Sequence, residues 1–175
     1  VPFTRELYIE KSDFAEVPPP KFQRLKPDGE VRLMGAYIVR CNEVVKDENG
    51  EIVEIRCTAD LETGNGMPVD GRKVKGTIHW VSAAHALDAD LYLYDNLFTL
   101  ENVNDVPEGT DYLDYLNPDS LKKLTGCKLE PSLAEAKEGD RFQFVRMGYY
   151  VKDREEGRFN RIVTLKDSFA KTLQK

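Results

Sequence analysis

The clearest structural signal in this chain is EVRLMGAYIVRCNEVVKDENGEIVEIRC, residues 30–57. Two stretches rich in β-branched and aromatic residues, 30–40 and 51–57, flank the dipeptide Asn49-Gly50. Because Asn and Gly both tolerate the positive φ angles of a tight primed turn, this dipeptide between two strand-like stretches is a strong hairpin signal. We therefore predict a β-hairpin that turns at these two residues.

Similar strand signals recur between turn clusters along the rest of the chain, as they do in all-β barrels and sandwiches. We predict further strands at residues 3–9, 73–81, 90–97, 141–151 and 159–165. Residues 131–137 indicate one or two helical turns, and residues 117–121 read as a turn into another strand or a short helix. The pattern predicts an all-β fold with a few short helices.

Length and composition describe a globular, acidic chain of 175 residues, with 41% hydrophobic and 32% charged residues and a net charge of −6. This size allows one domain or two small lobes. No run approaches the ~20 apolar residues of a membrane helix, and the first residues lack the pattern of a signal peptide. Since the sequence begins without Met and inside a predicted strand, we expect it to be a piece of a longer protein.

Charge is distributed unevenly along the chain. An acidic average disfavours nucleic-acid binding, but the segments differ in sign. Residues 21–40, 71–85 and 141–175 carry +3, +3 and +5, whereas residues 41–70 and 86–140 carry −6 and −9. Because electrostatic fields act over a Debye length of about 8 Å, a basic side of such a molecule can still attract a phosphate backbone.

Motifs that carry catalytic or metal chemistry are scarce. The chain contains no phosphate-binding loop, dinucleotide fingerprint, zinc-protease motif or nucleophile elbow. Its three widely spaced cysteines indicate buried thiols in a reducing compartment. His79 and His85 fit either a metal or carboxylate couple or two hydrogen-bonded structural histidines, with the second reading favoured. Ser82 beside His85 is a weak candidate nucleophile.

Basic and aromatic residues on the predicted strands are the better lead. The residues concerned are Arg24, Arg32, Gln143 and Arg146, interleaved with Phe22, Phe142 and Phe144. Single-stranded RNA is recognised by stacking its bases on aromatic or guanidinium planes while Lys and Arg hold the phosphates. Arg and Phe also alternate on ordinary half-buried strands, so composition alone leaves both interpretations open.

A family resemblance separates these interpretations. Residues 70–86, DGRKVKGTIHWVSAAHA, closely resemble the C-terminal half of the glutaminyl-tRNA synthetases. Further similar motifs follow in the family order: YDNLF (94–98), NPDSL (117–121), FQF (142–144), GY (148–149), FNR (159–161) and LKDS (165–168). The resemblance covers essentially the whole chain, and the intact block at 79–85 is more similar to the glutaminyl than to the glutamyl branch.

The resemblance implies an anticodon-binding region over residues 1–175, built as two β-barrel lobes about a pseudo-dyad. We expect the lobes to divide near residues 85–100, and the resemblance also allows strands to be exchanged between them. It implies no cofactor in this stretch, because the family binds ATP and Mg²⁺ in a class I catalytic domain whose HIGH and KMSKS signatures do not occur here. We expect the first strand of the barrel region to lie upstream of Val1.

The resemblance carries three base contacts onto this sequence. Arg24 matches an Arg that contacts the third anticodon base or its phosphate, and Arg32 matches an Arg at the first-base pocket. Gln143 matches a Gln that reads the second base, a uracil, whose edge a side-chain amide can pair with because it both donates and accepts. Met34 stands where the family has a second Arg, and Val145 where it has a Glu.

Other residues carry over as contacts near the backbone of the anticodon loop. Arg146, Lys166 and Ser168 match such positions. Lys21 and Gln23 stand where the family has Gln and Lys, so the same two groups have exchanged places.

We predict a non-catalytic RNA-recognition module of a cytoplasmic, monomeric aminoacyl-tRNA ligase. Its expected partners are the anticodon loop of glutamine tRNA and the catalytic domain of the same enzyme, with no membrane. A barrel of the ribosomal 5S-RNA-binding type is an alternative that fits the two-lobe length less well. A protein-interaction lobe without RNA specificity, whose basic face docks acidic partners, is the alternative from another class.

Overall fold

The computed structural model describes residues 2–165. Within them it has eleven strands and three 3₁₀ helices and no α-helix, which confirms the all-β class with a few short helices. The elements in chain order are β1 (Leu7–Ile9), η1 (Lys11–Asp13), β2 (Glu30–Leu33), β3 (Ile38–Lys46), β4 (Ile52–Asp60), β5 (Thr77–Ile78), β6 (Trp80–Ser82), β7 (Leu87–Tyr94), η2 (Tyr112–Tyr115), β8 (Leu121–Leu129), η3 (Pro131–Glu135), β9 (Arg141–Phe144), β10 (Gly148–Lys152) and β11 (Arg158–Val163). No helix of this part of the chain is long and apolar enough to cross a membrane.

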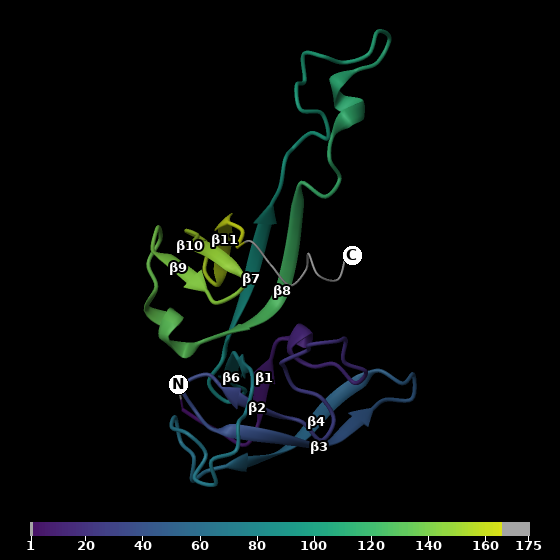
Figure 1. Cartoon of the computed structure of the whole chain (residues 1–175). Coiled ribbons are helices and arrows are strands. Elements are labelled where there is room, and N and C mark those ends of the chain that lie inside the picture. The colour runs from purple at the N-terminus through teal and green to yellow at the C-terminus, as the bar shows by residue number, and fades with distance from the viewer. Residues whose placement is uncertain (1, 166–175) are drawn as a thin grey trace. The chain divides into compact units, whose positions relative to one another are not determined.

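The chain divides between His85 and Ala86 into two compact units. Unit 1, which precedes this boundary, holds a four-stranded sheet in the order β4-β3-β2-β5 and a separate pair, β1-β6 (Figure 1). Its core consists of buried residues from these strands and from the segment before β2. The members are Leu25, Val31, Leu33, Val39, Cys41, Ile78 and Trp80.

Unit 2 is built on one five-stranded sheet in the order β8-β7-β11-β10-β9 (Figure 1). Its core is largely aromatic, because Tyr150 and Phe159 are almost fully buried and Phe142 and Phe144 pack against them. The Phe144 and Tyr150 rings stack with their centroids 4.4 Å apart. Between β7 and β8, residues 95–120 form an arm that leaves the sheet and carries η2.

The predicted hairpin exists as β3 and β4, but its details differ from the prediction. The stretch 30–40 is interrupted by a turn at residues 34–37, where Gly35 has φ 68° and β2 ends. At the far end only Gly50 has positive φ, so the turn is not the predicted primed type. The Asp47 carboxylate accepts bonds from the Asn49 and Glu51 backbone N–H groups at 2.9 Å, and this capping fixes a longer turn.

Several other element boundaries differ from the sequence prediction. The strand predicted at 73–81 is confined to β5 and β6, and the one predicted at 141–151 is two strands joined by a turn. Strand β8 follows the turn at residues 117–120, which settles the alternative left open there. The helical turns at 131–137 form only the 3₁₀ helix η3. The prediction that all cysteines are buried holds for Cys41 alone, because Cys57 is exposed on β4 and Cys127 is only partly buried.

Candidate nucleic-acid interface

Unit 1 contains a groove of about 500 Å³ that is lined mainly by basic side chains. The lining comes from the segment after the proline-rich connector, from the segment before β5, and from strands β2 and β3. The lining residues are Phe22, Gln23, Arg24, Lys26, Asp28, Glu30, Arg40, Arg72, Lys73, Val74 and Lys75.

Arg24 is held in place by a buried carboxylate. Its Nε lies 3.3 Å from Oδ1 of Asp13, and its Nη1 donates to the Ser12 carbonyl oxygen at 2.9 Å. The Asp13 side chain is 0% exposed and the Arg24 side chain 22%. Because a buried carboxylate requires a partner, Arg24 has a structural role in addition to any contact with a ligand.

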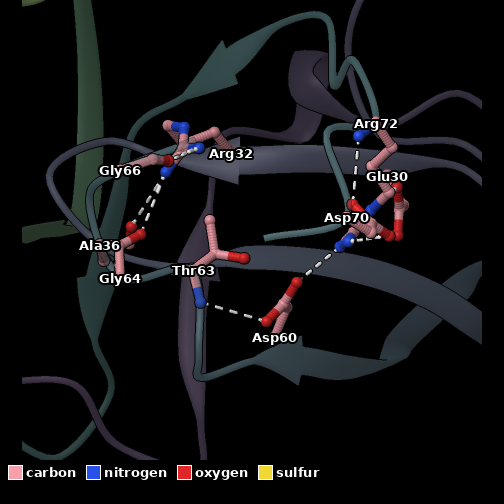
Figure 2. A network of polar contacts seen from close by, with 9 residues as sticks. All are labelled: Glu30, Arg32, Ala36, Asp60, Thr63, Gly64, Gly66, Asp70 and Arg72. Atoms are coloured by element: carbon pink, nitrogen blue, oxygen red, sulfur yellow. Dashed lines mark hydrogen bonds and ion pairs between the residues drawn. The ribbon is translucent and has the colours of Figure 1, made fainter. Parts of the chain in front are cut away.

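Arg32 does not line the groove, although it lies two residues from Glu30 on β2. Its guanidinium turns to the loop between β4 and β5 and donates to the carbonyl oxygens of Gly64 at 3.1 Å and Gly66 at 2.5 Å (Figure 2). A longer bond reaches the Ala36 carbonyl oxygen at 3.5 Å. Arg32 therefore ties this loop to the sheet.

The same loop is anchored a second time by Arg72 (Figure 2). Its guanidinium contacts three carboxylates, those of Asp60 at 2.6 Å, Asp70 at 2.9 Å and Glu30 at 3.1 Å. Asp60, Asp70 and Glu30 raise the pKa of Arg72 above its usual range. Contacts with Thr63 and, next, with Arg72 lower the pKa of Asp60 to about 2. Residues 60–72 are thus closed into a loop by charge-assisted hydrogen bonds.

In unit 2, the candidate residues lie on the β9–β10 hairpin. Gln143 is exposed on β9 and pairs in register with Tyr149 on β10, so the two side chains are cross-strand neighbours. Arg146 is exposed in the turn between these strands, with φ 66°. Tyr149 is 42% exposed and places an aromatic ring beside the candidate amide.

The structure corrects the reading of Phe142 and Phe144 as base-stacking rings. Both side chains turn to the inner face of the hairpin, where Phe142 meets Phe159 edge-on at 6.1 Å and Phe144 stacks on Tyr150. Strand alternation explains the difference, because residues 142 and 144 share the face opposite to Gln143. Tyr149, which sequence reasoning did not single out, is the exposed aromatic of this hairpin.

The remaining predicted residues are placed as follows. Lys21 is exposed with φ 64° and does not line the groove, whereas Gln23 does. Met34 is 41% exposed, and its carbonyl oxygen accepts a bond from Trp80 Nε1 at 3.0 Å. Lys166 and Ser168 lie outside the described residues. The groove thus unites Gln23 and Arg24 but not Lys21 or Arg32.

Five basic groove residues were not among the predicted contacts: Lys26, Arg40, Arg72, Lys73 and Lys75. The signal that pointed to them was the net charge of +3 on each of segments 21–40 and 71–85. Sequence spacing did not show that these two segments line the same groove. Their meeting in one groove is a product of the fold.

The two histidines do not belong to a metal site in the part of the chain that the structure describes. No group of three or more His, Cys, Asp or Glu side chains that could hold an ion occurs within residues 2–165. His85 Nδ1 lies 3.0 Å from Ser82 Oγ, and Ser82 Oγ is also 2.8 Å from Thr4 Oγ1. Because Ser82 is 0% exposed, its hydroxyl is a buried structural group.

Comparison with known proteins relates both halves of the chain to the same kind of domain. Residues 1–60 and 77–153 match two families, each described as an anticodon-binding domain of class I tRNA synthetases (E and Q). The chain is 54% identical to a glutamine–tRNA ligase of Xanthomonas campestris over 98% of its length, and 53% identical to that of Ectopseudomonas mendocina over 97%. A third relative, from Pseudomonas syringae, is 49% identical over 97%.

This chain spans about 30% of the length of those relatives. The matched part carries the strands, the basic groove and the β9–β10 hairpin described above. Both family matches name the same kind of domain, and each falls mainly within one of the two units. The chain therefore belongs to the anticodon-binding domains of the class I glutamyl- and glutaminyl-tRNA synthetases.

Proposed function

We propose that this chain is the anticodon-recognition part of a glutamine–tRNA ligase and binds the anticodon loop of glutamine tRNA. The observation that carries the proposal is that relatives named glutamine–tRNA ligase are 49–54% identical to this chain over 97–98% of its length. The family match supports the anticodon as the recognised element.

The arrangement of side chains fits this role in each unit separately. In unit 2, the exposed Gln143 amide can donate to and accept from the edge of a uracil at the middle anticodon position. The neighbouring Tyr149 ring offers a stacking surface, which favours single-stranded bases. In unit 1, Arg24 and the lysines of the groove supply cations for the phosphates or, for Arg24, for the third base.

Ligation itself belongs to the part of the whole protein that carries the class I catalytic chemistry, where ATP and Mg²⁺ are used. The contribution of this chain is selection: contacts with the anticodon stabilise the complex with the correct tRNA. We propose that the chain acts in the cytoplasm, as a monomer, beside the catalytic domain of the same enzyme.

The test is binding of the 175-residue chain to a labelled anticodon stem-loop of glutamine tRNA at several salt concentrations. A second stem-loop differs only at the middle anticodon base. We expect tighter binding of the cognate loop and a fall of log K with log salt of about 0.7 per phosphate contacted. Equal affinity for both loops, or no salt dependence, would instead favour the protein-interaction alternative and refute the proposal.

A further inference from the structure

Lys73, Val74 and Lys75 line one side of the groove, which we call the lysine wall. Lys73 and Lys75 are exposed, whereas Val74 between them is partly buried. In an extended segment, residues at i and i+2 point to the same side. The two ammonium groups therefore lie in a row along the same side of the groove.

The position of this wall is determined by a close approach of two backbones. A Cβ atom at Gly76 would lie 1.8 Å from the Gln23 carbonyl oxygen, and Gly76 has φ 92°. The Gly76 carbonyl oxygen also accepts a bond from the Arg32 backbone N–H at 3.2 Å. Glycine at this point thus locks the lysine wall against the segment that carries Gln23 and Arg24.

The charges of the groove are not equally available to a ligand. Arg72 is neutralised by three carboxylates, Glu30 of the groove among them, and Arg24 by Asp13. In contrast, the three lysines of the groove form no ion pair within residues 2–165; they are Lys26, Lys73 and Lys75. Asp28, the other acidic lining residue, offsets part of their charge. The positive potential of the groove therefore comes mainly from these lysines and from Arg40, which is also exposed and forms no ion pair within residues 2–165.

We propose that Lys73 and Lys75 form a phosphate track that binds the sugar–phosphate backbone of the RNA strand whose base or phosphate meets Arg24. This inference rests on the proposed function. A lysine ammonium is a flexible point charge, which suits phosphate contacts better than recognition of a base edge. The track positions the strand and does not read the sequence.

The experiment compares the wild-type chain with the double variant Lys73→Ala/Lys75→Ala on the cognate and middle-base-altered stem-loops. Loss of two phosphate contacts on a single strand should reduce the salt slope by about 1.4 and the affinity by roughly 25-fold at 0.1 M salt. Discrimination between the two loops should stay unchanged. Lys73→Arg/Lys75→Arg should retain most of the affinity, because the charge is kept.

A matched control removes the same charge from the same unit outside the groove. Arg5→Ala/Lys11→Ala changes two exposed basic residues that do not line it, and its salt slope should stay close to wild type. A wild-type slope in the lysine variant, or an equal loss in both variants, overturns the phosphate track while leaving the proposed function intact. Failure of the wild-type chain to bind either loop overturns both.

Discussion

The two units present their candidate residues in different ways. In unit 1, Arg24 is bound to buried Asp13, and Arg32 is bound to loop carbonyl oxygens. In unit 2, Gln143 is exposed on the β9–β10 hairpin and its side chain forms no hydrogen bond within the described residues. The two candidate arginines of unit 1 thus also hold its structure together, whereas the Gln143 side chain makes no such internal contact.

The difference has a physical consequence for mutation. Removing a side chain that satisfies a buried partner costs folding free energy as well as binding, because the partner is left without compensation. Removing an exposed side chain that has no internal partner changes binding alone. Unit 1 variants should therefore lose stability and affinity together, and Gln143 variants should separate the two.

The largest effect is expected for Gly76→Ala, which attacks the geometry of unit 1. The new Cβ would overlap the Gln23 carbonyl oxygen at 1.8 Å, and a non-glycine residue at positive φ costs about 1–3 kcal/mol by itself. We expect a total loss above about 3 kcal/mol. Urea unfolding followed by fluorescence of Trp80, the single tryptophan of the chain, reports on this unit.

Gly35→Ala is the matched control for that variant. Gly35 has φ 68°, but a Cβ atom added there would have nothing within 4 Å, so only the backbone cost of about 1 kcal/mol applies. Equal destabilisation by the two variants would show that the close approach at Gln23 is unimportant.

Arg24→Ala should come next, because it leaves the fully buried Asp13 without its cation. Breaking a buried pair in this way costs about 3–5 kcal/mol, and the partial exposure of Arg24 places the expected loss at the lower end. Urea unfolding measures the loss of stability. Stem-loop binding, measured at a denaturant concentration at which the variant is folded, gives the loss of affinity. Arg24→Lys should recover part of the stability, and an unchanged urea midpoint in Arg24→Ala would remove the contrast between the units.

Gln143→Ala tests the other side of the comparison. Stability should stay within about 0.5 kcal/mol of wild type, since the side chain is exposed. Discrimination at the middle anticodon base should fall by about tenfold, in the range of 1–3 kcal/mol typical of a base contact. Arg141→Ala, an exposed residue on the same face of β9, serves as the control and should weaken both stem-loops alike. If Gln143→Ala weakens the binding of both stem-loops by the same factor, Gln143 does not recognise the middle anticodon base.

The smallest effect is expected for Asp60→Asn, in the loop anchor of unit 1. Because the pKa of Asp60 is lowered from 3.8 to about 2 in the folded state, its stabilising contribution is present above pH 3.8 and is lost as pH falls through 2. The urea midpoint of wild type should exceed that of the variant at pH 6, and the gap should close between pH 4 and pH 2. A gap that does not change with pH would mean that the Asp60 charge contributes nothing to the loop.

Much of the fold could be predicted from sequence, and the failures have local causes. The strand-rich class and the β3–β4 hairpin follow from residue type and Asn49-Gly50, but the Asp47 side chain selected a longer turn. Residues 30–40 and 141–151 were each predicted as one strand because good strand formers flank the turns at Gly35 and Arg146. Periodicity is a good guide to which residues form strands but a poor guide to where strand pairing ends.

The sequence by itself determined the family, the all-β class and the identity of Arg24 and Gln143 as candidates, because motif order and residue type are linear properties. Only the tertiary structure decided how these residues are used. The pairing of Arg24 with Asp13, the inward turn of Phe144 and the presence of Lys73 and Gln23 in one groove depend on contacts between segments distant in sequence. Such contacts are set by chain packing and, in unit 1, by the close approach that Gly76 permits, and no linear pattern encodes them directly.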